Sequence, residues 1–169
     1  RRSLLHAQKT TLPLNEEQIG LLFAAITRAA HLDRNAKRDY VLIKGAYLLG
    51  CRVSEIAVIR WQDIEVLDEG GQIHLFGKGS KRRVVRVSSH TLALFEGLGR
   101  GETEAYVFPS PRGKGHLTRQ AIGDVCRKWG RAAGFHVYPH QLRHSHATQA
   151  IRRGVDVFTL QNTLGHSSS

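Results

Sequence analysis

Four short motifs along the chain contain cationic side chains that could act on a phosphodiester. The chemically active members are two arginines, one lysine and two histidines: Arg52, Lys78, His140, Arg143 and His166. A guanidinium offers a fixed fork of N–H donors and stays charged, which suits it to binding phosphate oxygens. Lysine and histidine can also transfer a proton to or from a reacting oxygen. The set could therefore bind one phosphodiester and protonate a leaving oxygen.

Arg52 follows Gly50 at a predicted helix junction, and Glu55 lies one turn further along the chain. One interpretation is a half-buried salt bridge between Arg52 and Glu55. The other is an arginine that points at a phosphate while the carboxylate fixes it from behind. Both interpretations can hold together.

Lys78 lies between Gly77 and Gly79 in a predicted hairpin, ahead of a row of further cations. One interpretation is a solvent-exposed basic turn that protects a sheet edge. The other is a hairpin tip that reaches a ligand, since the two glycines allow the backbone a close approach. The cations that follow are Lys81, Arg82, Arg83 and Arg86.

His140 and Arg143 stand at i and i+3 in the first turn of a helix predicted after Pro139, so they share a face. The positive end of the helix dipole makes this an anion site. His140 and His144 also have metal-like spacing, but no third ligand is evident, and we expect no metal. His166 follows a Leu-Gly helix end, where a lone histidine usually faces the helix dipole.

Positive charge dominates the composition, with 25 Lys and Arg against 14 Asp and Glu in 169 residues. The formal net charge of +11 predicts a polyanionic partner. Because no apolar run approaches the ~18 residues of a membrane span, nucleic acid is favoured over a membrane. Cys51 and Cys126 have neither metal-type nor scaffold-type spacing and are interpreted as reduced thiols in a cytosolic protein.

Hydrophobic periodicity predicts a mainly α-helical fold with one small three-stranded antiparallel sheet, an α+β domain. Strands are predicted from Ile64 to Leu67, from Ile73 to Phe76 and from Val84 to Val87. Helices are predicted over residues 15–30, 40–49, 53–59, 89–98, 119–133, 140–152 and 156–164. Asn15 and Thr118 are predicted helix caps, and Tyr138, ahead of Pro139, is interpreted as core packing.

In order and spacing, the four motifs resemble those of the tyrosine recombinase, or phage integrase, family in its C-terminal catalytic domain. The resemblance covers nearly the whole chain, from about Thr11 to Ser169. It rests on four stretches: GCRVSE at 50–55, GKGSKRR at 77–83, HQLRHSHAT at 140–148 and LGHSS at 164–168. The resemblance implies the DNA breaking–rejoining catalytic-domain fold over residues 12–169. It makes residues 1–11 a linker from an absent N-terminal core-binding domain.

The resemblance implies transesterification of double-stranded DNA through a 3′-phosphotyrosyl intermediate, without metal, nucleotide or other cofactor. Arg52 and Arg143 would hold the phosphate, and Lys78 would protonate the leaving 5′ oxygen. His140 and His166 would be the active-site histidines, with Glu55 as a supporting acid. The side chains expected to follow DNA phosphates are Lys81, Arg82, Arg83, Arg86 and Arg119.

One departure from the family pattern concerns the nucleophile, which in the family follows the second histidine by about two to three helical turns. No tyrosine occurs after Tyr138 in this sequence. We therefore expect a domain truncated before its nucleophile, inactive by itself, from a protein that acts as a tetramer on two duplexes. The expected location is the cytoplasm of a bacterium or archaeon, at the nucleoid, with a phage gene as another source.

Two alternatives remain open. The first is a non-catalytic DNA-binding relative or regulator that keeps the phosphate-binding residues and lacks the nucleophile. The second is a type IB topoisomerase, which shares the Arg/Lys/Arg/His set. The natural sequence beyond Ser169 would decide between an enzyme and a non-catalytic relative.

Overall fold

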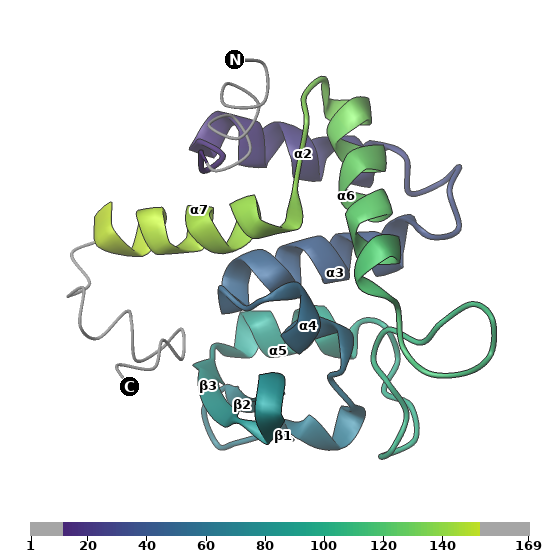
Figure 1. Ribbon diagram of the computed structural model, residues 1–169, viewed down its shortest axis with the longest axis vertical. Helices are drawn as coiled ribbons and strands as arrows, with labels where there is room; N and C mark the ends of the chain where they lie inside the picture. The colour runs from purple at the N-terminus through teal and green to yellow at the C-terminus, as the bar shows by residue number, and fades with distance from the viewer. Residues whose placement is uncertain (1–11, 153–169) are drawn as a thin grey trace.

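Residues 12–152 are described by the computed structural model, and they form six α-helices and one three-stranded sheet (Figure 1). The helices are α2 (Glu16–Arg28), α3 (Ala36–Leu49), α4 (Val53–Ala57), α5 (Ser89–Glu96), α6 (Arg119–Ala133) and α7 (Pro139–Arg152). The strands are β1 (Ile64–Val66), β2 (Gly71–Phe76) and β3 (Arg82–Val87). Short 3-10 helices occupy η1 (Trp61–Asp63) and η2 (Lys78–Ser80). The mainly α-helical domain with a small antiparallel sheet is confirmed. The predicted linker over 1–11 and helix over 156–164 lie outside the described residues.

The helices form the upper part of the molecule in Figure 1, and the sheet lies at the lower end. Helix α2 packs against α3 and α6, α7 lies along α3, and α5 joins α3 to β3. The core runs without interruption from the helices into the sheet, and its fully buried side chains include Leu22, Leu42, Ile56, Leu75 and Phe95. The helical part and the sheet therefore hold each other at fixed positions.

Side-chain caps begin two of the helices as the sequence predicts. The side-chain oxygen of Asn15 accepts from Gln18 N at 2.7 Å, and Gln18 returns a hydrogen bond to Asn15 N at 3.0 Å. The Thr118 hydroxyl accepts from Ala121 N at 3.0 Å and starts α6. These bonds satisfy backbone N–H groups that the first helical turn leaves without partners.

Helix α3 begins at Ala36, four residues earlier than the apolar pattern predicts. Its first turn contains Asp39. An aspartate is expected at the surface, but Asp39 is only 1% exposed. The Asp39 carboxylate accepts from Trp129 Nε1 at 2.8 Å and pairs with Arg38 at 2.8 Å. A buried carboxylate with two partners thus extends the helix into a stretch whose composition is polar.

The sheet order is β1-β2-β3, with both pairs antiparallel. Ile73 is opposite Val85 and Leu75 is opposite Arg83, so these four side chains share one face. Ile73, Leu75 and Val85 are buried, which identifies this face as the one toward the core. The neighbouring positions on β2 and β3 point to the other side.

The first described residues, 12–14, are hydrogen-bonded to α7. Leu14 N donates to the buried Ser145 hydroxyl at 2.8 Å, and that hydroxyl donates to Gln141 O at 2.6 Å. The Gln141 amide also donates to Leu12 O at 3.0 Å. Residues 12–14 are therefore fastened to the first two turns of α7.

Across residues 12–152, no helix has both the length and the apolar character that crossing a bilayer requires.

Gly130 and Gly20 provide a matched pair of helical glycines for a stability test. A Cβ at Gly130 would lie 2.6 Å from Phe135 O and 2.9 Å from Val137 Cγ2, whereas one at Gly20 would meet nothing within 4 Å. We predict that Gly130→Ala lowers the free energy of unfolding by about 2 kcal/mol or more, through displacement of the turn that leads into α7. Gly20→Ala should raise it by about 0.5–1 kcal/mol. Urea denaturation of both variants measures the changes, and a neutral Gly130→Ala would contradict the packing described.

Candidate active site

Glu55 is a buried carboxylate at the junction of α4 and β3, with 3% of its surface exposed. Its Oε1 accepts from the backbone N–H of Arg52 at 2.8 Å and from Arg83 Nη2 at 3.1 Å. Its Oε2 accepts from Arg83 Nε at 2.9 Å. Both carboxylate oxygens are therefore hydrogen-bonded, which is the condition for burying a charge at moderate cost.

Arg143 approaches the same carboxylate from α7. Its Nη1 lies 3.7 Å from Glu55 Oε1 and donates to Gly50 O at 3.1 Å. Gly50 ends α3 with φ 61°, a left-handed conformation that suits glycine. The turn presents the Gly50 carbonyl to Arg143 and directs the following residues toward Arg52. Gly50 therefore helps to position both arginines.

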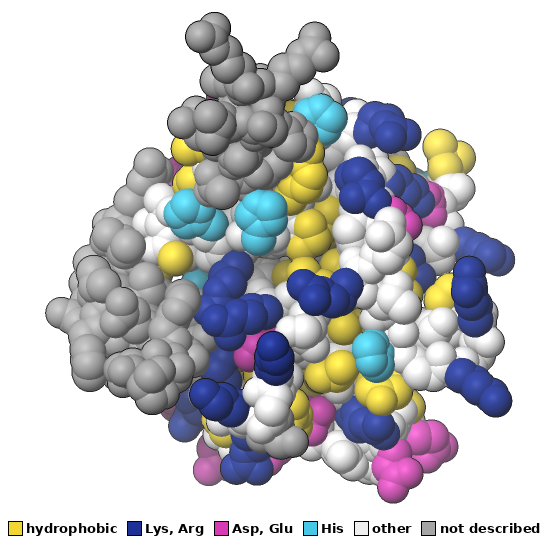
Figure 2. Space-filling model, in the orientation of Figure 1, with side chains coloured by type: hydrophobic (Ala, Val, Ile, Leu, Met, Phe, Trp, Pro, Cys, Tyr) yellow, Lys and Arg dark blue, Asp and Glu magenta, His cyan; other side chains and the backbone are white. Residues whose placement is uncertain are grey.

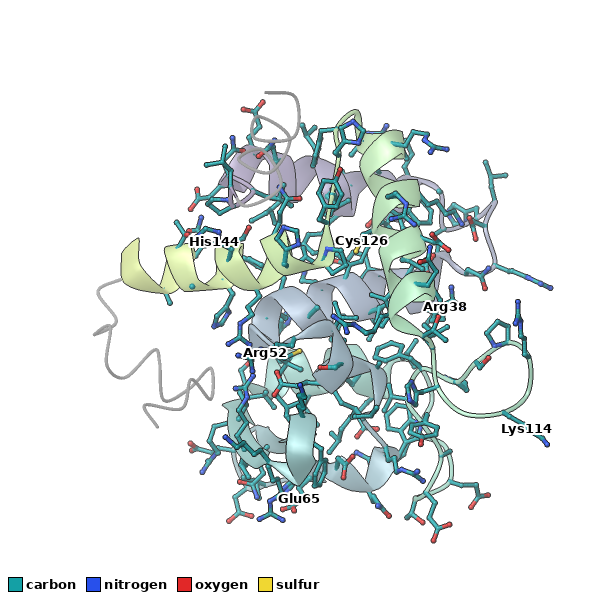
Figure 3. All side chains as sticks on the ribbon, in the orientation of Figure 1. Arg38, Arg52, Glu65, Lys114, Cys126 and His144 are labelled. Carbon is teal, nitrogen blue, oxygen red and sulfur yellow. The ribbon has the colours of Figure 1, made fainter. Side chains whose placement is uncertain are left out.

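The side chain of Arg52 is exposed, at the junction of α3 and α4 between α7 and the sheet (Figure 3). Of the two interpretations of this motif, the salt bridge between the side chains of Arg52 and Glu55 is not formed, because Glu55 pairs with Arg83 and Arg143. Arg52 is the residue that precedes α4, and Glu55 caps the helix by binding the Arg52 backbone N–H. The carboxylate thus fixes the Arg52 backbone and leaves its guanidinium directed outward.

Two guanidinium groups, those of Arg83 and Arg143, face one carboxylate at this junction, and the charge of Arg52 also acts on Arg143, so positive charge is in excess. Burial alone would raise the pKa of Glu55, but the hydrogen bonds from Arg83 and the Arg52 N–H hold that pKa below its ordinary value. Burial lowers the pKa of Arg143, and the charges of Arg52 and Arg83 lower it further. A bound anion would relieve this repulsion, which makes the junction a favourable place for a phosphate.

Lys78 lies at the exposed tip of the β2–β3 hairpin, beside a groove of about 630 Å³. This groove is lined by Ser54, Val58, Phe76, Gly77, Lys78 and Arg119. A second groove of about 340 Å³ is lined by Val53, Arg119, Gln120, Gly123, Arg127, Pro139 and His140. Arg119 lines both grooves, so the groove of Lys78 and the groove of His140 meet at this one side chain. Figure 2 shows Lys and Arg side chains on this face between the sheet and the histidines near α7.

His140 is exposed at the start of α7 and stacks on Tyr138, with ring centroids 5.8 Å apart and planes 22° apart. Tyr138 stacks in turn on His136 at 6.4 Å. The expectation that Tyr138 is core packing is therefore wrong. Its ring is half-buried and forms the middle of a three-ring stack. The alternating spacing of residues 136 and 138 is the sequence signal for the first two rings, because alternate side chains of an extended segment share a side, and His140 follows in the first turn of α7.

The cationic side chains expected to follow DNA phosphates divide into two groups. Arg83 belongs to the junction, since its side chain is 14% exposed and bound to Glu55, and its predicted contact with DNA stays a prediction. For the others, exposure is compatible with the prediction, which stays a prediction: Lys81, Arg82, Arg86 and Arg119. His166, the remaining predicted active-site residue, lies outside the described residues.

Two further kinds of site, a metal centre and a reactive cysteine, were also considered for the described residues. Within residues 12–152, no three His, Cys, Asp or Glu side chains are grouped so that they could hold a metal. Burial raises the pKa of the Cys51 and Cys126 thiols to about 12, so both are protonated at neutral pH. Neither cysteine is therefore suited to act as a thiolate nucleophile.

Sequence comparison connects the chain to characterised proteins. A family model described as the phage integrase family matches residues 13–169. The chain is 36% identical to tyrosine recombinase XerD of Bifidobacterium longum, over 94% of this chain and 56% of that protein. It is 33% identical to tyrosine recombinase XerA of Pyrococcus furiosus, over 94% of this chain and 55% of that protein. The chain thus spans little more than half the length of these relatives.

Solved structures share the fold of the chain. The XerH site-specific recombinase, bound to its difH substrate in a pre-cleavage complex, superposes with a TM-score of 0.78 at 24% identity. The alignment covers 94% of this chain and 48% of that one. The crystal structure of XerA recombinase superposes with a TM-score of 0.76 at 25% identity, over 93% of this chain and 57% of that one. The predicted fold class is confirmed.

The hydrogen bonds to Glu55 predict a specific dependence of stability on pH. The folded-state pKa of Glu55 lies below its ordinary 4.5, so the stabilising contribution is complete above pH 4.5. As pH falls below 4.5, the unfolded chain takes up the proton first, and the contribution is lost on approach to the folded-state pKa. Glu55→Gln should therefore cost about 3–5 kcal/mol at pH 7 and clearly less at pH 3.

Urea titrations of wild type and Glu55→Gln at the two pH values measure this difference. The same change at exposed Glu102 is the control and should cost little at either pH. A Glu55→Gln cost that is equal at pH 7 and pH 3 would show that the carboxylate charge is not what stabilises the junction.

Proposed function

Since this chain belongs to the phage integrase family, we propose that it is the catalytic domain of a tyrosine-type site-specific DNA recombinase. Such an enzyme cuts and rejoins double-stranded DNA by transesterification through a 3′-phosphotyrosyl intermediate, without cofactor. The observation that carries the proposal is the junction at which Glu55 binds the backbone N–H of Arg52 and pairs with the guanidinium of Arg143. Val53 and Ser54, which follow Arg52 in the chain, line the groove of His140 and the groove of Lys78.

The two arginines would stabilise the charge that develops during strand cleavage. When a tyrosine oxygen attacks phosphorus, negative charge grows on the non-bridging phosphate oxygens. Arg143 is oriented by Gly50 O and Glu55, and the outward guanidinium of Arg52 stands on a backbone fixed by the same carboxylate. Donors held in place before the reaction need no reorganisation as it proceeds.

Lys78 and the histidines would take part in proton transfer. A 5′-alkoxide is a poor leaving group, and Lys78 at the hairpin tip would protonate it. His140 would donate a hydrogen bond to the phosphate or move the tyrosine proton, and His166 would contribute in the same way. Glu55 would be the supporting acid. These roles follow the match of the residues to the family motifs and agree with the exposure of Lys78 and His140.

The full enzyme would also need a nucleophile, a DNA-binding surface and further copies of the chain. We place the attacking tyrosine C-terminal to His166, in a longer protein of which residues 12–169 are the catalytic domain. The exposed cations would follow the phosphates of the duplex: Lys81, Arg82, Arg86 and Arg119. Several copies, four on two duplexes, would act together in the cytoplasm at the nucleoid. XerH, whose structure superposes on this chain, is itself bound to its difH substrate.

Covalent trapping tests the proposed activity. The protein, at the length its gene encodes, is incubated with nicked duplexes that carry the site selected from a random library by binding. A protein–DNA adduct that survives denaturation and is destroyed by protease supports the proposal. Sequence-specific binding without any adduct would instead identify a non-catalytic DNA-binding relative. Relaxation of supercoiled plasmid that needs no particular site would indicate a topoisomerase.

Arg143→Lys in the same protein should reduce adduct formation at least ~100-fold and leave most of the DNA affinity intact. Lysine keeps the charge but cannot reproduce the planar two-point contact with a phosphate. Single-turnover cleavage and a binding titration measure the two effects. Arg28→Lys on α2 serves as the control and should behave as wild type. A near-normal cleavage rate for Arg143→Lys would reduce Arg143 to a positioning contact.

A sulfur substitution separates proton transfer from phosphate binding. A 5′-thiolate leaves without a proton, so Lys78→Ala should fail on ordinary DNA and recover when sulfur replaces the bridging 5′ oxygen. Arg52→Ala should fail on both substrates, because sulfur leaves the non-bridging oxygens unchanged. Cleavage rates of both variants on both substrates decide the matter. Equal losses for Lys78→Ala on the two substrates would reopen Lys81 or His140 as the acid.

A further inference from the structure

Strand β3 carries a charged side chain at a position where its register requires a core residue. Arg83 is opposite Leu75, and the next pair on the same face is Val85 with Ile73. Leu75 and Ile73 are fully buried, and Val85 is 7% exposed. A cation on this face costs stability unless an acceptor is provided. Its presence therefore calls for a reason other than the packing of the sheet.

Glu55 is that acceptor, and the contact is a two-point one. Arg83 Nε and Nη2 donate to the two different carboxylate oxygens at 2.9 and 3.1 Å. A planar pairing of this kind fixes orientation as well as distance. The same carboxylate binds the backbone of Arg52 and lies 3.7 Å from Arg143 Nη1. Glu55 thus joins β3 to both phosphate-binding arginines.

The hairpin tip has few described side chains that could attach it to the rest of the domain. Between Gly77 and Arg83, the side chains of Lys78, Lys81 and Arg82 are exposed. Gly77 N donates to Lys81 O at 2.6 Å, which closes the turn without connecting it to the body of the domain. Along the chain after the turn, Arg83 is the first of the described side chains that reaches the helical part.

We propose that Arg83 is a positioning residue that sets the hairpin lysine, Lys78, in place relative to Arg52 and Arg143 through Glu55. It touches no phosphate itself. One carboxylate thereby aligns the group that would protonate the leaving oxygen with the groups that would bind the phosphate. The inference rests on the proposed function, since it takes Lys78 as the acid.

The first test compares cleavage of ordinary DNA with cleavage of DNA that has sulfur at the bridging 5′ position. Arg83→Lys keeps the charge and loses the two-point contact, so Lys78 loses its alignment. Cleavage of ordinary DNA should fall at least ~10-fold and return to within about threefold of wild type on the sulfur substrate. Equal losses on both substrates would overturn the proposal.

Arg38→Lys is the matched control. Arg38 also pairs through two nitrogen atoms with a buried carboxylate, that of Asp39, but it lies on α3 away from the hairpin. It should leave both cleavage rates unchanged. If Arg38→Lys shows the same substrate pattern as Arg83→Lys, general loosening of the fold explains both results and the proposal fails.

A second measurement separates positioning from DNA contact. Arg83→Met should leave the slope of log affinity against log salt unchanged, whereas Arg82→Met should lower its magnitude by about one if Arg82 meets a phosphate. A slope lowered by Arg83→Met would make Arg83 a phosphate contact. Should Arg83→Met fail to fold, Arg83→Lys still decides through the cleavage test.

A third measurement needs neither DNA nor catalysis. Amide hydrogen exchange at Gly77, whose N–H is bonded to Lys81 O, reports opening of the hairpin. In Arg83→Lys this exchange should rise at least ~10-fold relative to amides of α6, and in Arg38→Lys it should not. Unchanged exchange would overturn the proposal. If the wild-type protein cleaves no DNA, the proposed function fails, and exchange alone then decides the coupling.

Discussion

One buried negative charge determines how the two parts of this domain meet. Glu55 accepts hydrogen bonds from the start of α4 and from strand β3, and it forms an ion pair with Arg143 on helix α7. A carboxylate in such a position is stable only when its oxygens are satisfied, so each donor is held as firmly as the carboxylate. The arrangement of the arginines is thus a consequence of satisfying Glu55. Their excess charge is what remains for a ligand.

The two grooves beside this junction receive side chains from elements of different kinds. His140 starts a helix whose first turns are fastened by buried hydrogen bonds, and its ring rests on Tyr138. Lys78 stands on an exposed turn that includes Gly79 at φ 74°. Phosphate binding benefits from rigid donors, whereas delivery of a proton to a departing oxygen requires an approach that follows the oxygen. The contrast between helix and hairpin suits this division of labour.

Local signals in the sequence were enough to predict the helices between residues 15 and 152, the three strands, the place of Lys78 in a hairpin and that of His140 in a first helical turn. These local signals failed where a residue far away in the sequence determines the local structure. The early start of α3 depends on Trp129, which is 90 residues from Asp39. The partner of Glu55 is Arg83, 28 residues away, and spacing alone favoured the nearer Arg52. Alternation along β3 does place Arg83 on the face of Val85, so the strand pattern contained the signal for its inward direction.

The attachment of residues 12–14 to α7 gives the domain a mechanical property. Leu12 and Leu14 are bonded to Gln141 and Ser145, which flank Arg143 on the same helix. A displacement of the backbone at Leu12 would therefore be passed through these hydrogen bonds to the first two turns of α7, which carry His140 and Arg143.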